Sequence, residues 1–111
     1  MIKLDPKYQT VLQSSFNGGV FTTVTDTLFV SSVRIDFTTG AMYATIQKGT
    51  GIPFVSNLPP TELCVNPDGS FISQDGSWSG SSPAVVALVA QLKAAFDGFI
   101  LASGLVTGTV I

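Results

Sequence analysis

The side chains that could support catalysis in this chain are carboxylates, lysines, hydroxyls and a thiol. The chain contains no histidine, so neither a Ser-His-Asp nor a Cys-His nucleophile can be built from one copy, and a zinc site with imidazole ligands is excluded as well. Cys64 is the only cysteine, which excludes an intrachain disulfide. Its apolar neighbours Leu63 and Val65 are typical of a short strand, where a free cysteine behaves as a small buried hydrophobe.

Three short motifs resemble chemical sites but fit turns better. Residues 76–80, Gly-Ser-Trp-Ser-Gly, lack the central serine of a nucleophile elbow. Residues 48–51 have neither the spacing nor the following lysine of a phosphate loop. Asn66, Asp68 and Asp75 could supply oxygen ligands to calcium, yet their spacing matches no EF-hand and such residues are common in turns. The sequence therefore predicts no catalytic residue, no metal site and no cofactor, and a protein that is not an enzyme.

Two aromatic residues are candidates for binding. Trp78 lies in a polar Gly/Ser segment, where its ring could stack on a sugar or anchor a protein partner. The alternative, which we prefer, is that Trp78 folds back over the open end of the core. Tyr43 alternates with apolar residues and is expected on the polar face of a hairpin.

The charge content favours self-association over nucleic-acid binding. Charged residues make up 11% of the chain, less than half the share of about 25% usual for soluble domains. Little electrostatic repulsion between copies is expected, which removes one barrier to association. The net charge is −2 and the five basic residues are scattered, so no basic stripe is available to follow a phosphate backbone.

Residues 29–48 predict a β-hairpin. The apolar residues that alternate with polar ones on the two sides of its turn are Val33, Ile35, Phe37, Met42, Ala44 and Ile46. A two-residue loop at Thr39-Gly40 would place Phe37 opposite Met42 and Val33 opposite Ile46. All apolar side chains then share one face, which indicates an antiparallel sheet with one buried side.

Residues 83–104 predict a helix whose boundary depends on Gly98. Ser82 is a suitable N-cap and Pro83 a suitable first residue. The apolar residues that recur at spacings of three and four are Val85, Leu88, Val89, Leu92, Phe96, Phe99 and Ile100. Gly98 either ends the helix after Asp97 or is tolerated within a helix that ends near Gly104; we prefer the longer helix because Phe99 and Ile100 extend the stripe.

The same segment fails an energetic test for membrane insertion. The nine strongly apolar residues between Val85 and Leu101 contribute about −4.5 kcal/mol on the insertion scale. Lys93 and Asp97 cost about 2.5 to 3.5 kcal/mol each at a helix centre. We therefore expect no membrane span, and a helix covered by its own sheet and by a neighbouring subunit.

The rest of the chain can be assigned coarsely. Residues 5–15, with Asn17-Gly18-Gly19 beyond them, predict a short amino-terminal helix, and Val20 to Thr25 predicts a strand. Gly49 to Pro60 predicts a loop with at most a short edge strand near Phe54-Val55. Strands at 63–65 and 70–73 around Asn66-Pro67-Asp68-Gly69 predict a second hairpin with a type I turn, and Ser77 to Ser82 predicts a linker.

The last seven residues form an uncharged, β-prone segment, here named the carboxy-terminal tail (residues 105–111). A free tail of this kind would be prone to aggregation, so it should add a strand to the edge of its own sheet, which we prefer, or to that of another copy. Its candidate contact residues, with one from the preceding helix, are Leu101, Leu105, Val106, Val110 and Ile111.

These patterns predict an α+β fold in one domain over residues 1–111: an antiparallel sheet of two or more β-hairpins with one face covered by a C-terminal helix, and a short N-terminal helix. The expected function is that of a non-enzymatic structural subunit that associates with itself or with other subunits of a larger particle, such as a virion or surface assembly. The alternative is a small carbohydrate- or peptide-binding module that uses exposed aromatic residues. The amino-terminal residues show no apolar run of the length that a secretory signal requires, so we expect a chain that is not exported by that route or one whose signal was removed.

Overall fold

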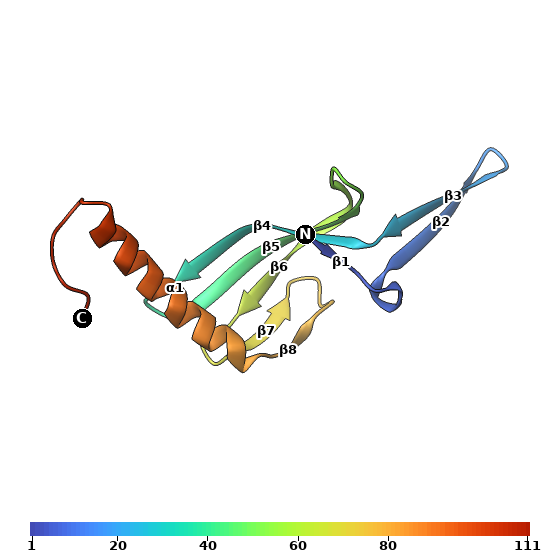
Figure 1. Ribbon diagram of the computed structural model, residues 1–111. Coiled ribbons are helices and arrows are strands. Elements are labelled where there is room, and N and C mark those ends of the chain that lie inside the picture. Colours follow the sequence, from blue (N-terminus) through green and yellow to red (C-terminus); the bar gives the residue numbers. More distant parts are fainter.

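The computed structural model describes residues 1–111, with the side chain of Phe16 left aside. Among the residues described, six strands form an antiparallel sheet in the order β1-β4-β5-β6-β7-β8, and β2 pairs with β3 in a separate ribbon (Figure 1). The elements are β1 (Ile2–Lys3), a 3-10 turn (Pro6–Tyr8), β2 (Thr10–Phe16), β3 (Gly19–Thr25), β4 (Thr27–Asp36), β5 (Ala41–Thr50), β6 (Val55–Val65), β7 (Ser70–Ser73), β8 (Ser79–Ser81) and α1 (Pro83–Ala102). An antiparallel sheet followed by a C-terminal helix confirms the α+β class.

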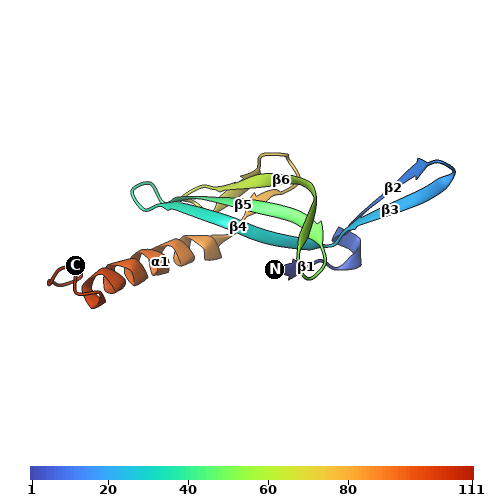
Figure 2. The same ribbon diagram turned by 90° about the horizontal axis from the view of Figure 1, so that it is seen from above.

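The molecule is elongated. Its extents are 69 × 29 × 20 Å and its radius of gyration is 19.0 Å, whereas a compact domain of this length has a radius of gyration of about 13 Å. The β2–β3 ribbon projects from one end of the six-stranded sheet and α1 projects from the other (Figures 1 and 2). The β2–β3 ribbon and α1 therefore both lie outside the six-stranded sheet.

The core lies on one side of the sheet, here named the inner face. The register pairs Val33 with Ala44 and Ala44 with Leu63, so these side chains share that face. Among the residues described, the buried hydrophobic ones are Ala44, Ile46 and Val65. This core is small for a chain of 111 residues, because the inner face is filled only around β5 and β6.

The predicted hairpin of β4 and β5 is present with a different register. Asp36 pairs with Ala41 and Val33 with Ala44, so the turn contains four residues, 37–40, instead of two. The Asp36 carbonyl accepts the Gly40 amide at 2.7 Å, and Gly40 has a φ of +80°, which glycine adopts without strain. The predicted pairs are therefore wrong by two residues, but the predicted faces are correct because side chains alternate with a period of two.

The predicted N-terminal helix is wrong. Only the 3-10 turn at Pro6–Tyr8 is helical there, and Thr10–Phe16 forms β2. The ribbon pairs Thr10 with Thr25, and its two-residue loop is Asn17-Gly18, with φ values of 51° and 76°. Asn-Gly with both residues at positive φ is the turn that a two-residue β-hairpin favours, whereas the sequence pattern predicts that a helix ends before it.

Two segments predicted as loops contain strands. β5 continues to Thr50 and β6 begins at Val55, where the sequence predicted a loop over 49–60. Pro59 and Pro60 are accommodated because the register of β5 and β6 shifts between Ile46 and Lys48, and prolines are tolerated at such bulges. The predicted linker over 77–82 contains β8, which pairs with β7. The second predicted hairpin is confirmed, with Val65 opposite Phe71.

Helix α1 has the predicted start and the longer of the two predicted extents. It begins at Pro83 after the N-cap Ser82, continues through Gly98 and ends at Ala102. No residue of α1, which is described throughout, is buried. Its contact with the sheet includes Phe37 and Phe96, whose ring centroids are 6.2 Å apart. The helix thus lies beside the inner face without closing it (Figure 2).

A core substitution tests the small inner-face core. Ile46→Ala should lower the free energy of unfolding by about 2 to 5 kcal/mol, because Ile46 is 7% exposed and its removal leaves a cavity. Urea denaturation at a fixed protein concentration measures the change. Ile72→Ala, at a residue of β7 that is 55% exposed, should cost less than about 1 kcal/mol. Equal losses at the two positions would contradict this placement of the core.

Candidate interaction surfaces

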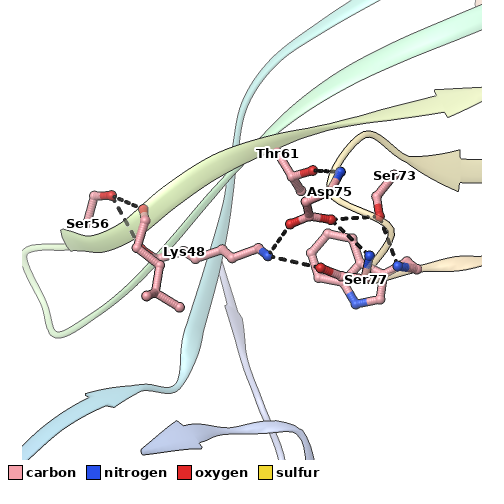
Figure 3. Close-up of polar contacts among 8 residues, drawn as sticks. Lys48, Ser56, Thr61, Ser73, Asp75 and Ser77 are labelled. Atoms are coloured by element: carbon pink, nitrogen blue, oxygen red, sulfur yellow. Dashed lines mark hydrogen bonds and ion pairs between the residues drawn. The ribbon is translucent and has the colours of Figure 1, made fainter. Parts of the chain in front are cut away.

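The densest polar cluster surrounds Lys48 on β5 (Figure 3). Its Nζ lies 2.7 Å from Asp75 Oδ2 and 3.3 Å from Ser77 Oγ, both in the segment between β7 and β8. The Nζ also lies 4.9 Å from the centroid of the Trp78 ring. The Lys48 side chain is 14% exposed, so its charge is satisfied by protein groups and an aromatic face instead of by bulk water.

Asp75 is the acceptor at the centre of this cluster. Its Oδ1 accepts hydrogen bonds of 2.9 Å from the Ser73 hydroxyl and from the Ser77 amide. The Lys48 ammonium, followed by the hydrogen bonds from Ser77, holds the pKa of the Asp75 carboxyl far below its usual range. A carboxylate with a strongly depressed pKa is a weak general base. The arrangement suits a structural contact that ties the β7–β8 segment to β5. We name the contact of Lys48 with Asp75 and Ser77 the Lys48 staple.

The residues considered for calcium are engaged elsewhere. The Asp68 carboxylate accepts the amide and hydroxyl of Ser70, and Asn66 Nδ2 donates to the Ser70 hydroxyl at 3.1 Å. Asp75 is paired with Lys48. Within the part of the chain that the structure describes, no three His, Cys, Asp or Glu side chains are grouped so that they could hold a metal ion.

The two predicted aromatic candidates lie in different places. Trp78 is half-buried and lines a cavity of about 200 Å³ together with Tyr8 and Lys48. Tyr43 pairs with Arg34 and Cys64 on the outer face of the sheet, and the Arg34 guanidinium lies 4.4 Å from its ring centroid. The structure therefore does not bring Trp78 and Tyr43 together in one binding surface.

An apolar concavity among the described side chains is a groove between α1 and the inner face of β4 and β5, here named the apolar groove. Its volume is about 620 Å³. It is lined by Val30, Val33, Ile35, Phe37, Met42, Ala44, Leu88, Leu92 and Phe96. These residues include no charged or polar side chain, and Val33 and Phe96 are more than half exposed. The sheet face that the sequence predicted to be covered is therefore open to solvent in one copy.

The β2–β3 ribbon forms a projecting arm, here named the hairpin arm (residues 10–25). It contains no charged residue. Among its described side chains, the large apolar ones that are 50% exposed or more are Val11, Leu12, Val20 and Phe21. An isolated two-stranded ribbon is at best marginally stable in water, so this arm lacks the packing that would normally support it.

Polar contacts fix the base of the hairpin arm. Asn57 of β6 accepts the Thr25 hydroxyl at 2.7 Å and donates to the Val24 carbonyl at 2.9 Å, and we name this contact the Asn57 clamp. Nearby, Asp26 pairs with Lys3. The Lys3 ammonium, then the hydroxyls of Thr50 and Thr27, lower the pKa of Asp26 to about 2. The arm is exposed along its length but anchored where it leaves the sheet.

The carboxy-terminal tail pairs with no strand of its own sheet among the described residues, contrary to the preferred alternative. It turns back over the last turns of α1, where Leu101, Val110 and Ile111 line a shallow cavity of about 240 Å³ (Figure 1). Leu105 and Val106 are exposed. The physical reason is that α1 leads the chain away from the sheet, so the tail begins at the far end of the molecule.

Helix α1 passes a test of length and composition for a membrane span. Its apolar window has a mean hydropathy of 1.8, and none of that window is buried in the part of the structure described. Lys93 and Asp97 lie within the helix. The expectation that α1 does not span a membrane stays a prediction.

Comparison with known proteins gives no relatives. No protein-family model matches the chain, and no curated protein or solved structure matches it. Function must therefore be argued from the surfaces described above.

Sequence reasoning missed the apolar groove and the hairpin arm. A signal for the arm was present, because residues 10–25 contain no charge and are centred on Asn17-Gly18. The groove had no such signal, because its width depends on how α1 is tilted from the sheet.

The Lys48 staple predicts an acid-sensitive contribution to stability. The pKa of Asp75 in the folded chain lies below its ordinary value of 3.8, so this contribution is present above about pH 4 and is lost as the pH falls further. Lys48→Met should raise the pKa of Asp75 towards 3.8 and weaken the loss of stability in acid. Carboxyl NMR titration measures the pKa and denaturant unfolding measures the stability. Lys7→Met, at a lysine without an ion pair in the described structure, should change neither; an unchanged Asp75 titration in Lys48→Met would contradict the assignment.

Proposed function

We propose that this protein is a non-enzymatic structural subunit that acts by associating with copies of itself to build a larger particle, such as a virion or a surface assembly. The proposal needs no cofactor and no nucleic acid. Its partners are other copies of this chain or other subunits of the same particle.

The observation that carries the proposal is the exposed area of a single copy. The accessible surface is 7773 Å² for a chain of 11.6 kDa, whereas a folded monomer of that mass exposes about 5,800 Å². The excess of about 1,900 Å² per copy is more than twice the roughly 800 Å² that each partner buries in a standard protein interface. Exposed large apolar side chains lie in the apolar groove, the hairpin arm and α1. A monomer with this surface is poorly stabilised, and association would remove it from water.

The charge distribution supports the same proposal. With 11% charged residues and a net charge of −2, copies repel one another weakly. In this proposal α1 contributes to protein contacts, with its sheet-facing side covered partly by its own inner face and partly by a neighbour. The cost of placing Lys93 and Asp97 in a bilayer argues against a span, whereas both can remain hydrated at a subunit boundary.

The proposal predicts that the purified chain associates. Sedimentation velocity and light scattering over a range of concentrations should show a species larger than 11.6 kDa, and electron microscopy should show a defined ring, shell or filament. The same measurements at about 1 M NaCl should leave the species intact, because apolar contacts are not screened by salt. A dilute and concentrated sample that are both monomeric would refute the proposed function.

A second candidate function is a small carbohydrate- or peptide-binding module. It is favoured by the cavity that Trp78, Tyr8 and Lys48 share, which combines aromatic faces with polar groups. Its volume of about 200 Å³ is below the range of about 300 to 1,000 Å³ typical of ligand pockets. A single sugar ring or one peptide side chain is the size of ligand that this cavity would accept.

Tryptophan fluorescence tests this second function, because Trp78 is the only tryptophan. Titration with monosaccharides and short peptides should shift the emission if the cavity binds them, and Tyr8→Ala should weaken that response. Tyr43→Ala, on the outer face, is the matched control and should leave it unchanged. A response that is absent at millimolar ligand, in a chain that is monomeric, would exclude the module as well.

A further inference from the structure

The apolar groove and an open sheet edge coincide. β1 pairs only with Thr27 and Leu28 of β4 in the described structure, so the edge of β4 from 29 to 36 has no neighbouring strand on that side. The same strand contributes Val30, Val33 and Ile35 to the groove. An occupant that satisfied both features would be a β-strand whose backbone pairs with β4 and whose apolar side chains cover the groove.

The hairpin arm has the properties of that occupant. It is a preformed ribbon, and the outer edges of both of its strands lack a partner strand in the described chain. Leu12 pairs with Thr23 and Phe21 pairs with Ser14, so Leu12 and Phe21 share one face of the ribbon. Both are at least half exposed. Neither surface carries a charge, so their contact would bury no unpaired ion.

The two surfaces cannot meet within one copy. The hairpin arm projects from one end of the sheet and α1 with the groove lies towards the other, in a molecule 69 Å long (Figures 1 and 2). The Asn57 clamp holds the base of the arm at its own end. A contact between arm and groove must therefore join two copies.

The surface area agrees with one such contact at each end. In a head-to-tail chain every copy has two interfaces, and a standard interface removes about 800 Å² from each partner. Two of them remove about 1,600 Å², close to the excess of about 1,900 Å² over a compact monomer of this mass. A two-fold dimer through one surface would cover only half of that area.

We propose that the hairpin arm of one copy docks in the apolar groove of the next, with Leu12 and Phe21 over the groove and the ribbon alongside β4. This inference rests on the proposed function and specifies its interface. Such a contact is heterologous, so it produces a ring if the rotation between copies closes and a filament if it does not.

Two variants and their mixture test the inference. Phe21→Asp places a charge on the arm, and Val33→Asp places one in the groove at a residue that is 51% exposed. Each alone should raise the concentration needed for half-assembly at least about tenfold. Mixed in equal amounts, they should form a 1:1 heterodimer and no larger species, because the intact arm of the Val33→Asp chain meets the intact groove of the Phe21→Asp chain. Sedimentation velocity with one variant fluorescently labelled measures all three samples.

Matched controls separate this contact from general loss of apolar surface. Val20→Asp lies next to Phe21 on the other face of the ribbon, and Ile72→Asp lies at an exposed position of β7, a strand that contributes nothing to the groove. Both should assemble like the unmodified chain. Circular dichroism should show that all four variants retain the fold, and a variant that unfolds is replaced by Phe21→Ser or Val33→Ser.

The outcomes distinguish this inference from the function on which it rests. An unmodified chain that assembles while Phe21→Asp and Val33→Asp assemble equally well would overturn the arm-and-groove contact but leave the structural function intact. Loss of assembly in both variants with no heterodimer on mixing would indicate a contact in which each copy needs both Phe21 and Val33, such as a two-fold contact, and would also overturn the inference. An unmodified chain that remains monomeric would refute both.

Discussion

The structure depends on a shortage of buried apolar surface. The buried hydrophobic residues among those described are Ala44, Ile46 and Val65, while the two projecting elements, the hairpin arm and α1, each expose apolar side chains. A domain of this size would ordinarily bury roughly two thirds of its unfolded surface. Here the hairpin arm and α1 project from opposite ends of the sheet, so the sheet does not cover their apolar side chains. One copy is therefore a sheet, here called the frame, with exposed apolar side chains on the elements that project from its two ends.

What holds this frame together is mainly backbone pairing and a few polar contacts. The central strands β4, β5 and β6 are long and continuously paired, apart from bulges such as the one at Ser31. The Lys48 staple ties the β7–β8 segment to β5, and the Asn57 clamp ties the hairpin arm to β6. These contacts need no large apolar core, because β5 and β6 pair with a strand on both sides and the charges of Lys48 and Asp75, and of Lys3 and Asp26, are paired. They fix the directions in which the exposed elements project.

The sequence predicted what depends on local pattern and missed what depends on distance. The extent of α1 and the faces of the β4–β5 hairpin were predictable, because apolar spacing of three to four or of two is read directly along the chain. The register was not, since a loop of two and a loop of four residues give the same faces. The prediction of an amino-terminal helix was wrong because Asn17-Gly18 can end a helix or form a hairpin turn. The pairing of residues 10–16 with the strand at 19–25 decides between them, and the apolar spacing within residues 5–15 does not report that pairing. The apolar groove combines residues more than fifty positions apart, such as Val33 and Leu88, and no local pattern reports the angle at which a helix leaves a sheet.

When the two ends of a subunit differ and bind each other, residues that do not touch the partner can determine the angle between successive copies. In the proposed contact the groove receives the hairpin arm, and the angle between successive copies is set by how the arm leaves its own sheet. The hydrogen bonds of Asn57 with Thr25 and Val24 constrain that angle, and they lie at the base of the arm and not at its exposed end. Closure of a ring requires the same rotation at every step, so a rigid base matters as much as a complementary surface. The low charge of the chain agrees with this proposal. The apolar contact between arm and groove would supply the attraction between copies, and the Asn57 clamp would constrain their relative orientation.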